Sequence, residues 1–74
     1  MKPEHQDVFK KIGLNIAYFR KDKNITQQKL ADIIGISRNH LQRVERGAAP
    51  SLDTLIDISS TLQVPLKMFF EFRE

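Results

Sequence analysis

The sequence predicts an all-α protein in which five short helices pack around one core. Apolar residues recur every three or four positions, a spacing that places them on one face of a helix. Serine, threonine or proline precedes several of these stretches and glycine follows two of them, as at helix ends. The strict alternation of apolar and polar residues that is typical of strands does not occur.

We expect the five helices at residues 8–23, 26–35, 37–46, 51–62 and 65–72. Asn24 suits the left-handed conformation that closes the first helix, and Gly35 and Gly47 end the second and third. The residues expected to face the core are Phe9, Ile12, Ile16, Phe19, Leu30, Ala31, Ile34, Leu41, Val44, Leu52, Leu55, Ile58, Leu62, Phe69 and Phe70.

At 74 residues the chain has room for one compact domain, which we expect to span residues 1–74 with its core in 8–72. The absence of cysteine excludes disulfide bonds and thiolate zinc sites. No apolar run is long enough to cross a membrane, and the first seven residues carry mixed charge. We therefore expect a protein that is neither exported nor bound to a membrane.

Basic residues are concentrated in the middle of the chain. Residues 10–46 hold nine Lys or Arg against three Asp or Glu, whereas residues 47–74 hold two against four. A polyanion such as DNA binds localised positive charge, because Lys and Arg displace counterions from phosphate. From charge alone, the alternative is a solvated basic face.

Residues 27–46 are predicted to form two short helices joined at Gly35. Four apolar residues must meet in the angle between the helices, Ala31 must be small where they approach, and Gly35 must permit the turn. The sequence meets each requirement, so we predict a helix-turn-helix formed by the second and third helices. The four apolar residues are Leu30, Ile34, Leu41 and Val44.

A longer pattern runs through Ile12-Gly13 with Ile16 and Arg20, and then through residues 25–31, 35–38, 44–47 and 50–55. In this pattern the sequence resembles the Cro/repressor (Xre-type) helix-turn-helix family. The resemblance implies a lambda-repressor-like fold and a transcriptional regulator of bacterial or phage origin, cytoplasmic and nucleoid-associated, that binds specific double-stranded DNA. Residues 64–71 also resemble the last helix of restriction-modification controller proteins, a branch of small dimers.

The third predicted helix is the expected recognition helix, since an α-helix fits the major groove of DNA. On its outer face Arg38 and Arg43 can each present a bidentate fork to guanine, and Asn39 can pair with adenine. The resemblance implies base contacts at the same three positions. His40 and Gln42 flank this face and are weaker candidates, for which a phosphate, a thymine methyl or water are the alternatives.

Contacts to the DNA backbone are expected where the second helix begins, because free amides and the positive helix end attract phosphate there. The resemblance implies such a contact for Gln27. Lys29 stands where the family often has a glutamate, so it removes a reciprocal cap and is free to bind phosphate. The candidate phosphate-binding residues are Gln27, Gln28, Lys29, Ser37 and Arg46.

Arg20 and Glu45 are predicted to form a structural ion pair, because the family places an arginine in the first helix against a glutamate at the end of the third. We expect this pair to be buried.

The C-terminal end carries more apolar side chains than one helix face can bury. Phe69 and Phe70 fit core positions, which leaves Met68, Phe72 and, on the fourth helix, Ile56 for a partner subunit. We therefore predict a homodimer that binds a palindromic operator, with its recognition helices about 34 to 36 Å apart. The alternative is that the C-terminal end folds back on its own core.

An enzyme is a competing class of protein with little support in the sequence. His5 and His40 share no ligand spacing, and Ser37 and Ser51 resemble helix caps. We expect no catalytic residue, metal, cofactor or small-molecule ligand. The stronger alternative is an antitoxin-type protein-interaction module that binds DNA secondarily, since members of the resembled family serve that way.

Overall fold

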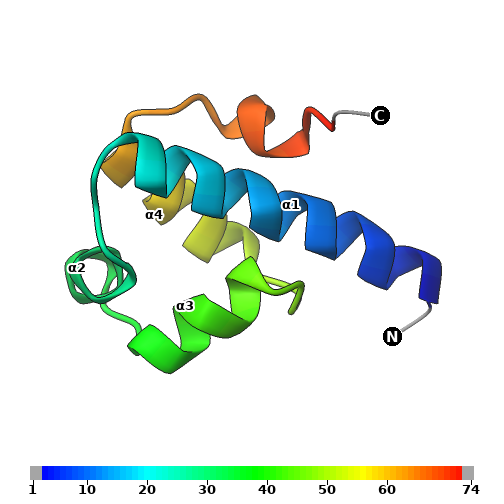
Figure 1. The fold of residues 1–74 in the computed structure, drawn as a ribbon, viewed down its shortest axis with the longest axis horizontal. Coiled ribbons are helices and arrows are strands. Elements are labelled where there is room, and N and C mark those ends of the chain that lie inside the picture. The colour runs from blue at the N-terminus through cyan, green and yellow to red at the C-terminus, as the bar shows by residue number, and fades with distance from the viewer. Residues whose placement is uncertain (1–2, 73–74) are drawn as a thin grey trace.

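A computed structural model describes residues 3–72, with side chains from His5 onward. Residues 1–2 and 73–74 of the predicted domain lie outside the described residues. In Figure 1, α1 crosses the molecule with α2 and α3 on one side and the short 3₁₀-helix η1 on the other. No helix of the described residues has the length and apolar character needed to span a membrane. The elements are α1 (Pro3–Asp22), α2 (Gln27–Ile34), α3 (Arg38–Glu45), α4 (Leu52–Leu62) and η1 (Leu66–Phe70).

Side-chain caps and left-handed residues set the helix boundaries. The hydroxyls of Thr26, Ser37 and Ser51 each accept a hydrogen bond from the backbone N–H three residues further on, at 3.0, 2.9 and 3.0 Å. These bonds satisfy amides that have no acceptor within the helix. The left-handed conformation predicted for Asn24 is confirmed, with φ of +59°, and Gly35, predicted to end the second helix, is left-handed as well, with φ of +78°. The bounds of α2 and α3 accordingly match the predicted ones apart from the capping residues.

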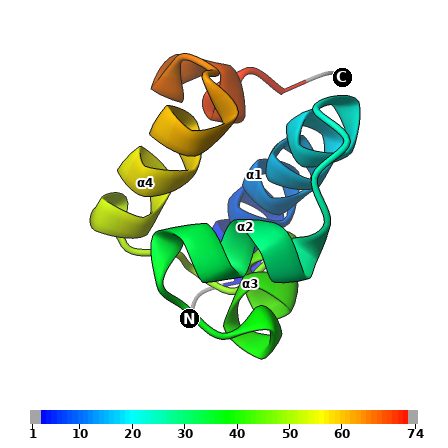
Figure 2. The ribbon, with the colours of Figure 1, turned by 90° about the vertical axis from the view of Figure 1, so that its left-hand side faces the viewer.

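The core lies where the helices converge. Ile16 of α1, Ile58 of α4 and Phe69 of η1 have no exposed surface, and the Phe69 ring centroid is 6.1 Å from that of Phe19. Figure 2 shows α1 and α4 on opposite sides of the molecule, with α2 and α3 at one end and η1 at the other. The buried apolar residues are Ile12, Ile16, Leu30, Ala31, Leu41, Val44, Leu55, Ile58, Leu62, Val64 and Phe69.

The predicted count of five helices is wrong, because the last element is a short 3₁₀-helix and not an α-helix reaching residue 72. The chain is already extended at Glu71, with φ −88° and ψ +105°. Pro65 supplies no side-chain cap. The side-chain amide of Asn15 in α1 donates to the carbonyls of Phe69 and Glu71, at 3.0 and 3.1 Å. Because this amide satisfies the carbonyls from outside, the segment does not need the hydrogen bonds of a longer helix.

Three smaller predictions are also corrected. α1 begins at Pro3, before residue 8, since proline suits the first turn of a helix. Leu52, expected in the core, is 62% exposed, because it lies about 120° from Ile58 around α4. Phe70, also expected in the core, is 45% exposed. Successive residues of a 3₁₀-helix point about 120° apart, and Phe69 takes the inward position.

The backbones of α1 and α3 come into contact at Gly13. A Cβ atom at Gly13 would lie 2.5 Å from the carbonyl oxygen of Val44 and 2.6 Å from that of Glu45. Glycine has no such atom, so it lets α1 lie directly against the end of α3. The position of α3 relative to α1 therefore depends on this residue.

Gly13→Ala is expected to lower the free energy of unfolding by about 2 kcal/mol, because the methyl group would overlap backbone that cannot easily move. In an unobstructed helix the same substitution raises stability by about 1 kcal/mol. Urea unfolding followed by circular dichroism measures the change. Leu14→Ala is the matched control, since Leu14 is 67% exposed and its loss should cost less than about 0.5 kcal/mol. A stabilised Gly13→Ala protein would contradict the close contact.

Candidate nucleic-acid interface

α2 and α3 meet at an angle whose inside is apolar and closed to solvent. Leu30 and Ala31 of α2 and Leu41 of α3 have no exposed surface. The turn between the helices is held by Gly35 and Ile36, whose N–H groups both donate to the carbonyl of Ala31, at 2.9 and 3.0 Å. Burial of the inner face fixes the two helices as one unit and leaves the outer face of α3 toward solvent.

The outer face of α3 displays the three residues that the sequence predicts to read bases. Arg38, Asn39 and Arg43 are exposed, whereas His40 and Gln42 are partly buried. Arg38 and Asn39 lie in the first turn and Arg43 in the second, so all three are within reach of one surface. The structure therefore groups two arginines and one asparagine at the solvent side of a helix whose other side is buried.

The first turn of α2 lies beside this face. A shallow hollow there is lined by Arg20, Thr26, Gln27, Gln28 and Arg38. The first amides of a helix lack acceptors within the helix and carry its partial positive charge. An anion in the hollow would therefore meet the helix end and a guanidinium together, which are the groups that bind phosphate.

The side chains of Gln27 and Gln28, both predicted to bind phosphate, are already hydrogen-bonded within the protein. The Gln27 amide donates to Oε1 of Glu45 at 2.9 Å, and the Gln28 amide donates to Oδ1 of Asp32 at 2.8 Å. These contacts leave the backbone amides as the groups at this helix end that are best placed for phosphate.

The other predicted phosphate ligands lie on α2 and at the two ends of α3. Lys29 on α2 and Arg46 at the end of α3 are exposed. Ser37 is exposed as well, and its hydroxyl oxygen accepts the N–H of His40. A hydroxyl that accepts a cap bond still has its own proton to donate to a phosphate oxygen.

Arg20 and Glu45 form a buried salt bridge between α1 and the end of α3. The Nε–Oε2 distance is 2.7 Å and the Nη2–Oε1 distance is 3.1 Å, and the two residues are 7% and 9% exposed. Arg20 Nη1 also donates to the carbonyl of Ile25 at 2.8 Å, and the Gln27 amide reaches the same carboxylate. The four residues, called here the Arg20–Glu45 cluster, join α1, α3 and the start of α2.

Two structural contacts were not predicted from the sequence. Asn15 ties η1 to α1, and Gln27 completes the Arg20–Glu45 cluster. Asn15 stands beside the buried Ile16 on α1, and a polar residue at the margin of an apolar stripe is a weak signal for such a contact. Gln27 gave no signal, because its partner is 18 residues away in sequence.

The three residues predicted at a dimer interface are not equally exposed. Ile56 on α4 is 46% exposed, whereas Met68 and Phe72 are partly buried against the core. Phe70 adds exposed aromatic surface on η1. Apolar surface available to a partner thus lies on both α4 and the C-terminal segment.

A comparison with known families agrees with this geometry. Residues 16–69 match a family model described as helix-turn-helix, and the chain belongs to this family. The resemblance to Cro/repressor (Xre-type) proteins that rests on the sequence motifs is thereby confirmed.

Two of the relatives found by sequence are longer proteins. Antitoxin PezA of Streptococcus pneumoniae is 49% identical over 47 residues, which are 64% of this chain and 30% of PezA. The HTH-type transcriptional regulator SlrR of Bacillus subtilis is 37% identical over 62 residues, 81% of this chain and 41% of SlrR. The chain therefore spans less than half the length of these relatives.

A solved structure of similar size has the same fold. The restriction-modification controller protein C.AhdI from Aeromonas hydrophila superposes with a TM-score of 0.80 at 27% identity, over 84% of this chain and 96% of that one. The chain therefore has a helix-turn-helix domain of the kind that a transcriptional regulator and a restriction-modification controller protein also contain.

Arg20→Ala and Glu45→Ala are each expected to lower the free energy of unfolding by about 3 to 5 kcal/mol, because each leaves a buried charge without its partner. Urea unfolding measures both losses. In a double-mutant cycle the second substitution should cost much less than the first. Arg43→Ala, which removes an exposed arginine of α3, should change stability by less than about 0.5 kcal/mol. A loss below about 1 kcal/mol for Arg20→Ala would be typical of an exposed ion pair and would contradict the burial of this one.

Proposed function

We propose that this protein is a transcriptional regulator that binds a specific sequence of double-stranded DNA, with α3 in the major groove. The observation that carries the proposal is the exposed group of Arg38, Asn39 and Arg43 on a helix whose opposite side is fixed in the core. Arginine forks match the two acceptors of guanine, and asparagine matches the acceptor and donor of adenine. The proposal involves no metal, cofactor or catalytic residue, and it places the protein in the cytoplasm with the DNA.

The start of α2 supplies the contact that orients α3 on the duplex. The hollow at Gln27 and Gln28 lies next to Arg38, so a phosphate bound there is adjacent to the first base reader. Lys29, Ser37 and Arg46 contribute further backbone contacts. Phosphate contacts fix register and orientation, whereas the base contacts distinguish sequences.

The protein is proposed to bind DNA as a homodimer, through the exposed apolar surface of Ile56 on α4 and Phe70 on η1. Met68 and Phe72, also predicted at this interface, are partly buried against the core and are not assigned to it. The domain measures 31 × 22 × 19 Å. In the proposed dimer the two α3 helices lie about 34 to 36 Å apart, one DNA turn, as a palindromic operator requires. The similarity to a restriction-modification controller protein supports a small regulator of this kind.

Arg38→Ala and Arg43→Ala are each expected to weaken binding to the selected operator by about 1 to 3 kcal/mol, or about five- to 150-fold, because each loses a bidentate base contact. The operator is first selected from a random duplex library with the unmodified protein. Binding of each variant to that operator and to a scrambled duplex is then measured by fluorescence anisotropy.

Lys67→Ala is the matched control for this experiment, since Lys67 lies on η1, across α1 from the proposed DNA face. It should leave the affinity for both duplexes unchanged. Lys29→Ala or Arg46→Ala should weaken binding to both duplexes alike and reduce the salt dependence by about one ion each. Equal affinity of the unmodified protein for operator and scrambled duplex would refute sequence-specific binding.

Ile56→Glu is expected to weaken self-association by at least about tenfold, because it places a carboxylate in an apolar subunit contact. Sedimentation velocity over a range of protein concentrations measures the change. Ile33→Glu is the matched control, since Ile33 on α2 has a similar exposure, 52% against 46% for Ile56. If both variants associate like the unmodified chain, Ile56 lies outside the interface.

A second candidate function is that of an antitoxin, which binds a protein partner and DNA secondarily. The identity of 49% with antitoxin PezA favours it, although the match covers only 30% of PezA. Purification of the tagged chain from its natural host distinguishes the two. An antitoxin would retain a small protein in equal amount, and the chain would restore growth to cells that express that protein. A regulator alone would retain DNA and its own second copy.

A further inference from the structure

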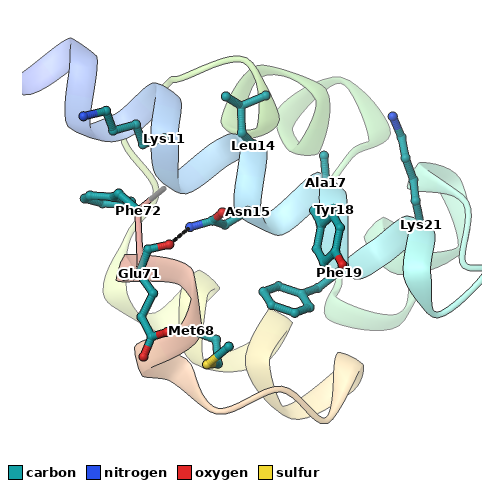
Figure 3. A pocket seen from close by; sticks show the side chains of 10 residues that line it. All are labelled: Lys11, Leu14, Asn15, Ala17, Tyr18, Phe19, Lys21, Met68, Glu71 and Phe72. Carbon is teal, nitrogen blue, oxygen red and sulfur yellow. Dashed lines mark hydrogen bonds between the residues drawn. The ribbon is translucent and has the colours of Figure 1, made fainter. Parts of the chain in front are cut away.

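A groove runs between α1 and the C-terminal segment (Figure 3). The η1 part of this segment lies on the opposite side of α1 from α3 (Figure 1). Its volume is about 630 Å³. In Figure 3, α1 forms the upper wall and the segment around η1 the lower wall. The amide of Asn15 bridges the two walls through its bonds to Phe69 and Glu71. The side chains that line the groove come from Lys11, Leu14, Asn15, Ala17, Tyr18, Phe19, Lys21, Met68, Glu71 and Phe72.

The α1 wall presents large apolar side chains to solvent. Leu14 is 67% exposed and Tyr18, one turn further on, is 51% exposed. On the other wall Met68 and Phe72 are partly buried against the core, so they form a fixed apolar surface opposite. Adjacent exposed apolar groups at the rim of a groove are typical of a surface that a partner covers.

A lysine stands at each end of this apolar stretch. Lys11 and Lys21 are ten residues apart on one helix, which separates them by about 15 Å along its axis. Together with Leu14 and Tyr18 they follow a spacing of three, four and three residues, so all four lie within about 80° around α1. Lys11 is held at its end of the groove by the ring of Phe72, whose centroid is 5.6 Å from Nζ.

The distance between the lysines determines what kind of acidic partner fits. A small carboxylate ligand can pair with one lysine but cannot reach both across about 15 Å. A helix that lies along α1 carries side chains at the same spacing and can place an acidic residue against each lysine and two apolar residues between them. Glu71, the acidic residue among those lining the groove, lies on the opposite wall from both lysines (Figure 3).

We propose that this groove binds an amphipathic helix of a protein partner, with two apolar residues against Leu14 and Tyr18 and an acidic residue against each of Lys11 and Lys21. η1, which borders the groove, lies across α1 from α3 (Figure 1), so the partner helix and DNA occupy different sides of the domain. The partner is therefore recognised while the regulator remains on its operator.

The probe for this site is a fluorescein-labelled, alanine-based helical peptide that repeats the spacing of the four groove residues. It carries leucine at the two positions that would contact Leu14 and Tyr18. It carries glutamate at the two positions that would contact Lys11 and Lys21. A second peptide has lysine at both glutamate positions. Fluorescence polarisation with the full chain should show about tenfold tighter binding of the glutamate peptide, because two ion pairs replace two repulsions.

Two variants test the assignment of the contacts. Lys11→Glu with Lys21→Glu should reverse the preference, so that the lysine peptide binds more tightly. Leu14→Ser should weaken binding of the glutamate peptide at least about fivefold, since it removes an apolar contact. Lys67→Glu makes one substitution of the same kind on η1, outside the groove lining, and should leave the preference unchanged.

The melting temperature of each variant and the operator binding of Leu14→Ser, measured alongside, should match those of the unmodified chain. Equal binding of the two peptides, or binding of neither, overturns the proposal. If Leu14→Ser lowers the self-association of the chain in sedimentation velocity, the groove is covered by a second copy and the proposal is likewise overturned. None of these outcomes depends on whether the DNA binding is sequence-specific.

Discussion

The buried salt bridge between Arg20 and Glu45 is the contact on which the arrangement of α1, α2 and α3 depends. Both charges are almost completely removed from water, which is tolerable only because each is matched by several hydrogen bonds. Arg20 also holds the carbonyl of Ile25, just before α2, and Glu45 also receives the amide of Gln27, in its first turn. A single carboxylate at the end of α3 thus fixes both helices that precede it, and this cluster can form only because Gly13 lets α1 approach α3.

This cluster links stability to the proposed recognition of DNA. α3 has one side in the core and the other in solvent, so any rotation of α3 would move Arg38, Asn39 and Arg43 away from the positions in which they are proposed to meet base edges. The pair at its C-terminal end and the caps at Ser37 and Gly35 hold both ends of the helix and the turn before it. Because the three side chains proposed to read bases stand on a rigid element, the ordering cost of binding is reduced, which favours discrimination between sequences.

Local chemistry made much of this structure predictable. The caps at Thr26, Ser37 and Ser51 and the left-handed Gly35 depend on near neighbours, so the bounds of α2 and α3 followed from the sequence. The bounds of the C-terminal element could not be predicted in this way. The amide of Asn15 reaches η1 across 54 residues of sequence, and η1 ends early as a result. The groove beside η1 could not be predicted from the sequence for the same reason, since its two walls come from opposite ends of the chain.

Nuclear magnetic resonance of the DNA-bound protein tests the central claim, that the outer face of α3 reads base sequence, most directly. Side-chain signals of Arg38, Asn39 and Arg43 are observed with the selected operator and with a scrambled duplex of equal length. The account predicts large shifts and slowed exchange of these signals with the operator alone, while the amides of Gln27 and Gln28 respond to both duplexes. Identical responses of the three side chains to both duplexes would contradict base reading and leave α3 as a phosphate-binding helix only.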